Sequence, residues 1–197
     1  VQPFTLIGAT TREGDVSAPL RTRFGVVSRI DYYTVEELKV LIESVSQKLQ
    51  YPVTPEAAGE IARRARGTPR VAIRMFKRMR DVAQVGRQES VDLKTVESGM
   101  RMLQVDSMGL DYIDRKILEI LLKRFDGGPV SLDTLAVSVG EEADTIYDVY
   151  ESFLIQIGFI ARTSRGRIAT RAAYEYFGMK PPTEQTPSQN QLRLFDN

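Results

Sequence analysis

The chain has 197 residues, of which 42% are hydrophobic and 27% charged, and its formal net charge is +1 at pH 7. This balance is typical of a soluble globular protein with a core, and the absence of a long apolar run or signal peptide predicts a cytoplasmic location without membrane insertion. Because the sequence contains no cysteine and no histidine, disulfides, thiolate metal sites and a histidine base are excluded. Any catalysis must therefore use carboxylates, hydroxyls or arginines, and we predict no metal site within this chain.

The first thirty residues have the pattern of the end of an α/β domain. Residues 4–10 are predicted to form a short buried strand and residues 26–30 a second one, with a loop and a short helix between them. A strand that opens the sequence without a preceding turn or cap predicts that the chain begins inside a domain.

Four short helices are predicted between residues 34 and 103, and together they would make a small bundle. Each begins at a residue that can cap a helix N-terminus. In one helix a glutamate follows the cap three residues later, and in two a proline follows it directly. These signals are Thr34 with Glu37, Thr54-Pro55, Thr68-Pro69 and Asp92.

The C-terminal part has the element order of a winged helix-turn-helix. Residues 105–111 are a plausible linker, and helices are predicted over 114–125, 132–139 and 142–156. Two strands, 159–162 and 167–170, then form a hairpin around a glycine turn. The order helix, helix, helix, hairpin is related to that of helix-turn-helix DNA-binding proteins. From residue 181 the sequence is rich in Pro, Gln, Thr and Ser, and we expect a disordered tail.

Three arginines have the chemistry of a phosphate site. Arg21 and Arg23 follow the first strand, while Arg70 is predicted in the first turn of a helix that begins at Thr68. Arginine suits phosphate because its planar fork donates hydrogen bonds in pairs, and a helix N-terminus attracts anions. Each feature alone is equally consistent with exposed, solvated arginines, but their combination and order are more specific.

Several motifs in this order resemble the RuvB family of bacterial AAA+ ATPases. They are Ile7-Gly8-Ala9-Thr10-Thr11-Arg12, Pro19-Leu20-Arg21-Thr22-Arg23-Phe24-Gly25, Ala62-Arg63-Arg64-Ala65-Arg66-Gly67-Thr68-Pro69-Arg70, Gly127-Gly128-Pro129-Val130, Leu154-Ile155-Gln156 and Arg162-Thr163-Ser164-Arg165-Gly166-Arg167. The resemblance extends to Pro182. Ser152 and Ser164 depart from it, because the family pattern has prolines there.

The resemblance implies a mostly helical fold with a small β component in four parts. Residues 1–31 would be the end of the AAA+ large domain, 32–105 a four-helix lid, 106–180 a winged-helix DNA-binding domain, and 181–197 the tail. Thr11 would be the sensor 1 residue, Arg23 the arginine finger that reaches a neighbouring subunit's ATP, and Arg70 the sensor 2 residue.

The resemblance also implies an ATP- and Mg-dependent motor that drives branch migration of Holliday junctions in recombination, DNA repair and the SOS response. Its partners would be duplex DNA, four-way junctions, RuvA and possibly RuvC, and it would form a homohexameric ring. The sequence contains no Gly-x-x-x-x-Gly-Lys-Ser/Thr loop and no acidic Walker B strand. We therefore expect the ATP-binding loop to lie upstream and the chain alone to be inactive as an ATPase.

The predicted hairpin is the better candidate for holding DNA. The helix before it carries carboxylates from Glu141 to Glu151, which phosphates would repel. Arg162, Arg165 and Arg167 surround the glycine turn without an acidic residue among them, and arginines can hold phosphates without reading bases. A solvated basic hairpin in a protein-interaction module is the alternative interpretation.

Other assignments stay open at this stage. The chain could be a non-enzymatic winged-helix regulator, although the acidic helix and the arginine pattern argue against it, or another AAA+ protein such as a clamp loader. The basic run from Arg63 to Arg80 could bind DNA or lie on outer faces of the lid helices. Arg64 and Arg66 in particular could serve a contact between subunits.

Overall fold

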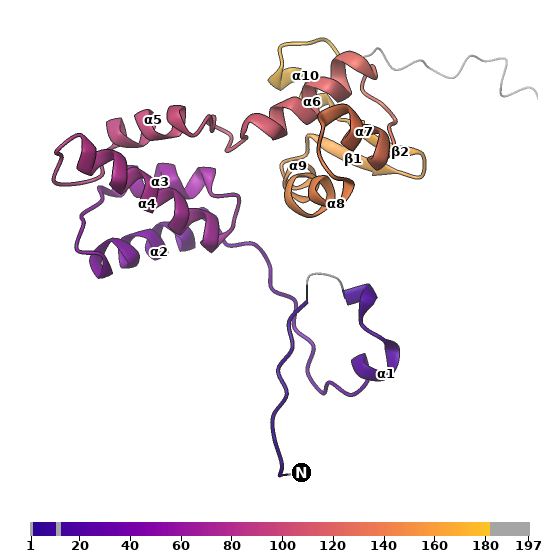
Figure 1. Cartoon of the computed structure of the whole chain (residues 1–197), viewed down its shortest axis with the longest axis horizontal. Helices are drawn as coiled ribbons and strands as arrows, with labels where there is room; N and C mark the ends of the chain where they lie inside the picture. Colours follow the sequence, from indigo (N-terminus) through magenta and orange to yellow (C-terminus); the bar gives the residue numbers. More distant parts are fainter. Residues whose placement is uncertain (1, 11–12, 182–197) are drawn as a thin grey trace, which may run out of the picture. The chain divides into compact units, whose positions relative to one another are not determined.

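The computed structural model describes residues 2–10 and 13–181 (Figure 1). The chain divides after Tyr32 into a short N-terminal unit and a larger unit that starts at Tyr33. Among the described helices, none is long and apolar enough to cross a membrane.

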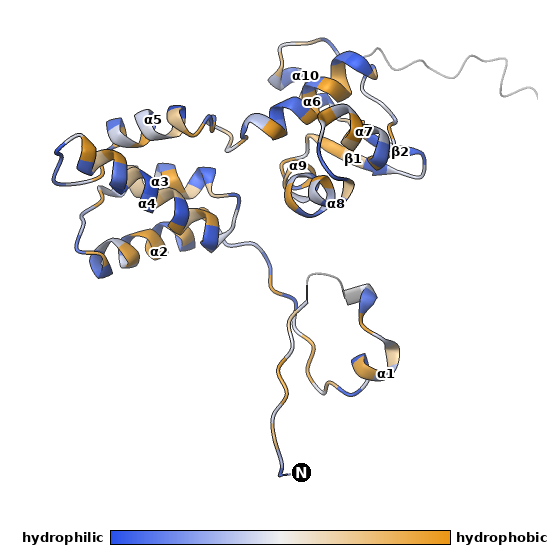
Figure 2. Cartoon of the chain, in the orientation of Figure 1, coloured by the Kyte–Doolittle hydropathy of each residue, from blue (hydrophilic) through white to orange (hydrophobic). Residues whose placement is uncertain are grey.

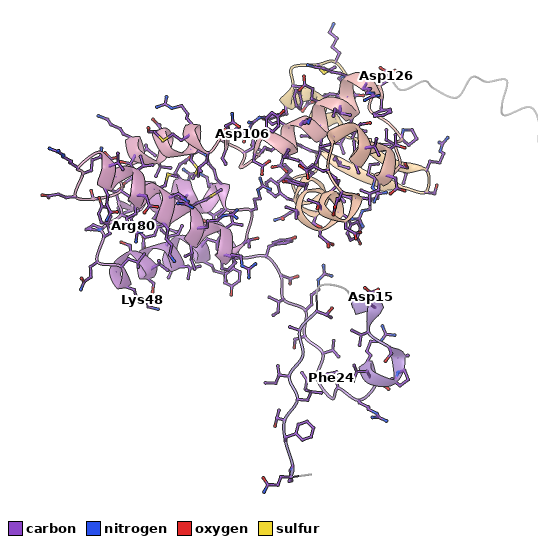
Figure 3. All side chains as sticks on the ribbon, in the orientation of Figure 1. Asp15, Phe24, Lys48, Arg80, Asp106 and Asp126 are labelled. Carbon is purple, nitrogen blue, oxygen red and sulfur yellow. The ribbon has the colours of Figure 1, made fainter. Side chains whose placement is uncertain are left out.

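The N-terminal unit is mostly irregular. Its described residues form a 3-10 turn, η1 (Glu13–Asp15), and a short helix, α1 (Ala18–Arg21), with Pro19 in its first turn. The prediction of strands over 4–10 and 26–30 is wrong. In the described part of the chain neither segment forms a strand, and most of their large apolar side chains are exposed. A strand requires a hydrogen-bonded neighbour, and these described residues do not supply one. The ring of Phe24, labelled in Figure 3, lies 3.6 Å from the position that a Cβ on Gly8 would take.

The lid consists of four helices whose starts agree with the sequence signals. They are α2 (Val35–Lys48), α3 (Pro55–Arg64), α4 (Pro69–Val85) and α5 (Leu93–Met102). Thr34 and Glu37 form the predicted capping box, and the side chains of Thr54 and Asp92 accept hydrogen bonds from the third residues of α3 and α5. These caps satisfy N–H groups that would otherwise lack a partner at the helix starts.

The apolar faces of the lid helices meet in one core. Figure 2 shows the alternation of hydrophobic and hydrophilic faces along α2 to α5. Leu38 and Ile42 of α2, Ile61 of α3 and Phe76 of α4 have no exposed surface. Full burial of side chains of this size stabilises the fold by roughly 1.5–3 kcal/mol each, so the lid has a core of its own.

The C-terminal part has a second core and the winged-helix order of elements. Its elements are α6 (Tyr112–Arg124), α7 (Leu132–Val139), α8 (Ala143–Thr145), a π-helix η2 (Ile146–Glu151), α9 (Ser152–Gln156), β1 (Ile160–Thr163), β2 (Gly166–Ala169) and α10 (Arg171–Tyr176). The core is formed by α6 and its neighbours, with Ile117, Leu118, Leu121 and Leu154 fully inaccessible. The helix predicted over 142–156 is thus a run of α8, η2 and α9, with the π-helix in the middle. The sequence analysis did not predict α10.

The wing is an antiparallel hairpin in which Arg162 faces Arg167 and Thr163 faces Gly166. Val130 adds a bridge to Arg167 through two backbone hydrogen bonds of 2.7 and 2.9 Å. Gly166 has φ 137°, and a Cβ there would lie 2.3 Å from the carbonyl oxygen of Val130. Glycine is therefore required where the hairpin turns close to its neighbouring segment.

The predicted linker between lid and winged helix is a compact loop built around Asp106 (labelled in Figure 3). The Oδ1 atom of Asp106 accepts two backbone hydrogen bonds from the loop, at 2.8 and 2.9 Å, and Oδ2 accepts one from the hydroxyl of Tyr176. Leu110 is fully buried. A Cβ on Gly109 would lie 2.9 Å from the carbonyl oxygen of Arg64, so the loop packs closely against the end of α3.

The guanidinium of Arg66, just after α3, spans this junction. Its Nε donates to the carbonyl oxygen of Gly109 at 3.0 Å, and Nη2 donates to the carboxylates of Asp111, at 3.1 Å, and Asp114. Its face lies 4.5 Å above the ring centroid of Phe153. Asp114 has no exposed surface, and its burial raises its pKa to about 7, although the charge of Arg66 opposes the rise.

The pKa of Asp114 predicts a pH-dependent stability. The folded pKa lies above the unfolded value of 3.8, so the folded state binds the proton more tightly. The stabilisation from this group is therefore complete below about pH 4 and is lost as the pH rises through about 7. We expect the free energy of unfolding of the wild type, relative to Asp114→Asn, to fall by up to about 4 kcal/mol between pH 4 and pH 8.

Urea unfolding followed by circular dichroism at several pH values would measure this difference. The same substitution at an exposed acidic residue, Asp133→Asn, is the reference against which the pH dependence for Asp114→Asn is compared. A pH-independent difference for Asp114→Asn would show that the Asp114 carboxyl is not protonated more readily in the folded state.

Candidate nucleotide-sensing and DNA-binding sites

The residues predicted to sense nucleotide lie in both units. Thr11 lies outside the described residues. Arg21 is the last residue of α1 and Arg23 lies two residues further on, and both are exposed. Neither side chain forms a salt bridge within the part of the chain that the structure describes.

Arg70 lies in the first turn of α4 and is exposed. The N-cap residue of this helix, Thr68, does not cap it with its side chain, because its hydroxyl donates to the carbonyl oxygen of Arg66 at 3.2 Å instead. The first N–H groups of this 17-residue helix therefore lack a side-chain acceptor. An open helix N-terminus beside an arginine has the geometry and charge for a phosphate group.

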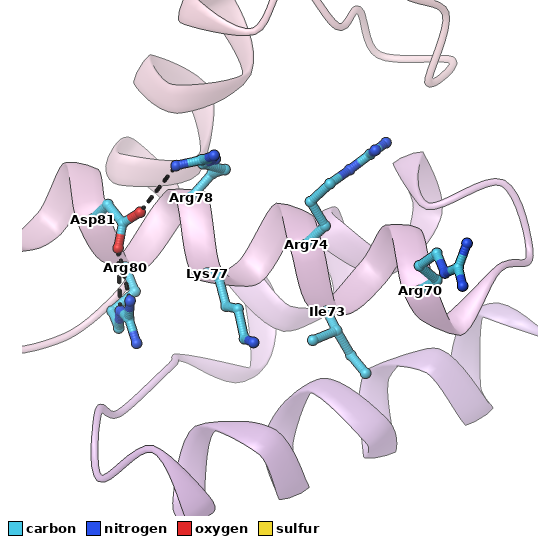
Figure 4. A pocket seen from close by; sticks show the side chains of 7 residues that line it. All are labelled: Arg70, Ile73, Arg74, Lys77, Arg78, Arg80 and Asp81. Carbon is cyan, nitrogen blue, oxygen red and sulfur yellow. Dashed lines mark hydrogen bonds and ion pairs between the residues drawn. The ribbon is translucent and has the colours of Figure 1, made fainter.

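Basic side chains continue from Arg70 along α4 (Figure 4). A groove of about 590 Å³ is lined by Arg70, Ile73, Arg74, Lys77, Arg78, Arg80 and Asp81. Asp81 binds Arg80 at 2.8 Å and Arg78 at 3.5 Å. Among the described residues, Arg70, Arg74 and Lys77 form no salt bridge, so the positive charge concentrates on the N-terminal half of the helix.

Arg64 and Arg66 are both largely enclosed by contacts within the described chain. The Arg66 side chain is 13% exposed and is occupied by its contacts across the junction. The Arg64 side chain is 11% exposed and binds Glu60 at 2.8 Å; burial lowers its pKa. A contact of these two residues with a neighbouring subunit stays a prediction. The sequence pattern missed the role of Arg66 because its carboxylate partners lie in a distant part of the chain.

The arginines of the wing fall into two groups. Arg165 is exposed at the turn, where its backbone N–H donates to the hydroxyl of Thr163 at 3.2 Å. Its side chain forms no salt bridge with any described residue. It is the wing arginine best placed to reach a phosphate outside the chain.

Arg162 and Arg167 both bind the same carboxylate, that of Glu151 at the end of η2. Arg162 donates from Nε and Nη2, each at 2.9 Å, and Arg167 donates from the same two atoms at 2.8 and 3.3 Å. Arg162 also lies 4.8 Å from the ring centroid of Tyr147. Burial raises the pKa of Glu151, but hydrogen bonds from Arg167 and Arg162 outweigh it and leave the pKa below its usual value. These three residues fix the wing to the helix.

The acidic character of the helix before the wing is smaller than the sequence indicates. Glu151 is only 2% exposed and faces the wing arginines, so it does not repel a phosphate outside. Glu142, Asp144 and Asp148, by contrast, are all exposed. This part of the helix still carries negative charge, whereas the wing tip carries Arg165.

The residues present fit a phosphate better than a metal ion. Arg70 and the open start of α4 supply cationic and N–H donors, as a nucleotide phosphate requires. Among the described residues, no group of acidic side chains is arranged to hold a metal ion.

Family profiles match the chain in three consecutive segments. Residues 1–30 match the Holliday junction DNA helicase RuvB P-loop domain, residues 33–106 the RuvB AAA lid domain, and residues 107–178 the RuvB C-terminal winged helix domain. The match of residues 107–178 to the RuvB winged helix domain rules against the clamp-loader alternative.

Solved structures agree with these matches. The Thermotoga maritima RuvB Holliday junction branch migration motor is 48% identical, with a TM-score of 0.86 over 92% of this chain and 61% of that chain. A lysine-to-arginine mutant of Thermotoga maritima RuvB gives the same values. An alanine-to-serine mutant is 47% identical, with a TM-score of 0.87, over 92% of this chain and 60% of that one.

The chain thus spans about three fifths of the length of these solved proteins. Its lid and winged helix have the same fold as theirs, and its sequence matches the family from the N-terminal segment through the wing. The chain belongs to the RuvB family.

Proposed function

We propose that this chain is part of an ATP-driven motor that moves duplex DNA through four-way junctions during recombination and repair. The observation that carries this proposal is the presence, in one chain, of a lid with Arg70 at an open helix start and a winged helix with one outward arginine at its tip. The first arrangement suits nucleotide phosphate, and the second suits a DNA backbone held without reading its bases. A motor that slides along DNA needs both.

In this proposal three residues act at the nucleotide. Thr11 orients the attacking water and contacts the γ-phosphate, Arg23 reaches the ATP of a neighbouring subunit, and Arg70 senses the nucleotide from the lid. Phosphoryl transfer depends mainly on positioning and charge stabilisation, which arginines supply without proton transfer. ATP with Mg²⁺ would bind to the loop carried elsewhere in the longer protein.

The proposed assembly is a homohexameric ring in the cytoplasm that works with RuvA and, at the junction, with RuvC. An arginine supplied by a neighbour makes hydrolysis depend on assembly, which supports a ring. Arg165 would contact the DNA backbone, while Arg162 and Arg167 would hold the wing in place through Glu151.

The chain alone should not hydrolyse ATP. Its sequence contains no phosphate-binding loop of the Walker type, so it lacks the backbone cradle for the β- and γ-phosphates. A phosphate-release assay on the purified 197-residue chain should give the rate of a matched blank. ATP turnover above that blank, retained after a further purification step that removes contaminating ATPases, would contradict this expectation.

Arg23→Ala in the longer protein should reduce ATP hydrolysis by about 10³–10⁵-fold while nucleotide affinity stays nearly unchanged. The reason is that the guanidinium of Arg23 serves the site of the neighbouring subunit. Mixing this variant with a variant defective in the phosphate loop should restore part of the activity, because each supplies what the other lacks. Arg29→Ala, which changes an exposed arginine paired with Asp31, is the control.

Loss of nucleotide binding in Arg23→Ala, together with no recovery on mixing, would mean that Arg23 acts within its own subunit. Full activity of the variant would remove Arg23 from the site altogether.

Arg165→Ala should weaken duplex binding equally for unrelated sequences and reduce the log–log salt slope by about 0.9 for each phosphate that the wing no longer neutralises. Lys123→Ala, an exposed basic residue on α6 paired with Glu119, should leave the slope unchanged. Arg167→Ala should instead lower the stability of the domain by about 1–3 kcal/mol, because it removes hydrogen bonds to the buried Glu151.

Fluorescence anisotropy at several salt concentrations, with thermal unfolding of each variant, separates these effects. An unchanged slope in Arg165→Ala would show that the wing tip does not contact DNA. Weakening that depends on DNA sequence would favour a winged-helix regulator over a motor.

A further inference from the structure

The backbone at Arg66 leads directly into the helix that carries Arg70. Arg66 and Gly67 have left-handed φ values of 57° and 65°, and the carbonyl oxygen of Arg66 accepts a hydrogen bond from the hydroxyl of Thr68 at 3.2 Å. A residue with a Cβ is disfavoured in the left-handed region, so other contacts must hold Arg66 there. A shift of the first turn of α4 would therefore move Arg66.

All the polar contacts of the Arg66 side chain lie on the winged-helix side of the junction. Its partners are the carbonyl oxygen of Gly109 and the carboxylates of Asp111 and Asp114 at the start of α6. The planar guanidinium also rests on Phe153 of α9. Lysine could not reproduce this set, because it lacks both the fork of donors and the flat face.

The contacts continue from Phe153 to the wing. Phe153 follows Glu151 by two residues in the continuous helical run of η2 and α9, and Glu151 binds Arg162 and Arg167 of the two wing strands. Direct contacts thus connect the start of α4, through Arg66 and this helical run, to the hairpin that carries Arg165.

Side-chain contacts also fix the linker between the lid and the winged helix, so the linker would not absorb a shift of the first turn of α4. Arg115 of α6 donates to the carbonyl oxygens of Leu110 at 2.8 Å and Gln104 at 3.0 Å, and it lies 3.7 Å from the carboxylate of Asp106. The loop is therefore fixed at both of its ends.

We propose that Arg66 is a positioning residue that couples the nucleotide state sensed at Arg70 to the DNA-binding wing. This inference rests on the proposed function, because it requires that the longer protein binds both nucleotide and DNA. Coupling between two sites is reciprocal: if nucleotide changes the affinity for DNA, DNA changes the affinity for nucleotide by the same factor.

The test compares duplex-DNA affinity in two nucleotide states. The dissociation constant of the full-length protein for a duplex is measured by fluorescence anisotropy with ADP and with a non-hydrolysable ATP analogue, and the ratio of the two constants is the coupling factor. We expect a factor of at least about 5 for the wild type, the lower end of typical allosteric coupling. For Arg66→Lys we expect the coupling factor to fall to within about twofold of 1, which means that nucleotide no longer changes DNA affinity. The dissociation constant of this variant for DNA in the presence of ADP should stay within about threefold of the wild-type value.

Arg63→Ala is the matched control. Arg63 lies on the helix that precedes Arg66, its side chain is 57% exposed, and its salt-bridge partner among the described residues is Glu60 of the same helix. This variant should keep the wild-type coupling factor. A purely structural role of Arg66 would lower stability and DNA affinity in both nucleotide states alike and leave the ratio unchanged.

Each outcome bears on the proposal. A wild-type factor retained in Arg66→Lys overturns the role of Arg66 and leaves the proposed motor intact. A wild type that binds no nucleotide or no DNA overturns the proposed function and the coupling with it, and a wild-type factor of one overturns the coupling alone. If Arg66→Lys does not unfold cooperatively, Phe153→Leu replaces it: this change keeps apolar bulk at the junction but removes the ring. A lowered factor in Phe153→Leu supports the path, and an unchanged factor overturns it.

Discussion

Pairing with inaccessible carboxylates separates the arginines that are neutralised within the described chain from those that are not. Asp114, with no exposed surface, and Glu151, with 2%, hold Arg66, Arg162 and Arg167 between them. A buried carboxylate that loses its cationic partner is costly, so removal of one of these arginines would destabilise the fold. Arg70 and Arg165 lie close to the paired arginines in sequence but form no salt bridge among the described residues. The proposed contacts with phosphate follow from this division.

The lid was predictable because its signals are local. The capping box at Thr34, the caps at Thr54 and Asp92 and the prolines that begin α3 and α4 all act within one turn of the helix they begin, and the apolar period of each helix follows at once. The winged-helix order was predictable for the same reason, from a glycine turn between two short β-prone segments. The match of these segments to the RuvB lid and winged-helix profiles agrees with this interpretation.

What the sequence did not predict depends on non-local contacts. The segments 4–10 and 26–30 have the composition of strands, but a strand is completed only by its hydrogen-bonded neighbours. Glu151 ends a π-helix over Ile146–Glu151, and no pattern of apolar residues indicates a π-helix. Glu151 therefore looked like a residue that faces DNA, while it lies against arginines 11 and 16 residues further along the chain. The same holds for Arg66, whose carboxylate partners are 45 and 48 residues away.

The small number of wing arginines without a salt bridge among the described residues is consistent with the proposed motor. Pairing of Arg162 and Arg167 with Glu151 leaves Arg165 as the wing arginine without a salt bridge among the described residues, so each subunit would hold DNA weakly. In the proposed ring, several weak contacts act together because binding of one subunit raises the effective concentration of DNA at the others. A single subunit can then release the backbone while its neighbours hold it. A wing with three free arginines would bind more tightly and release more slowly, which would oppose stepping along the duplex.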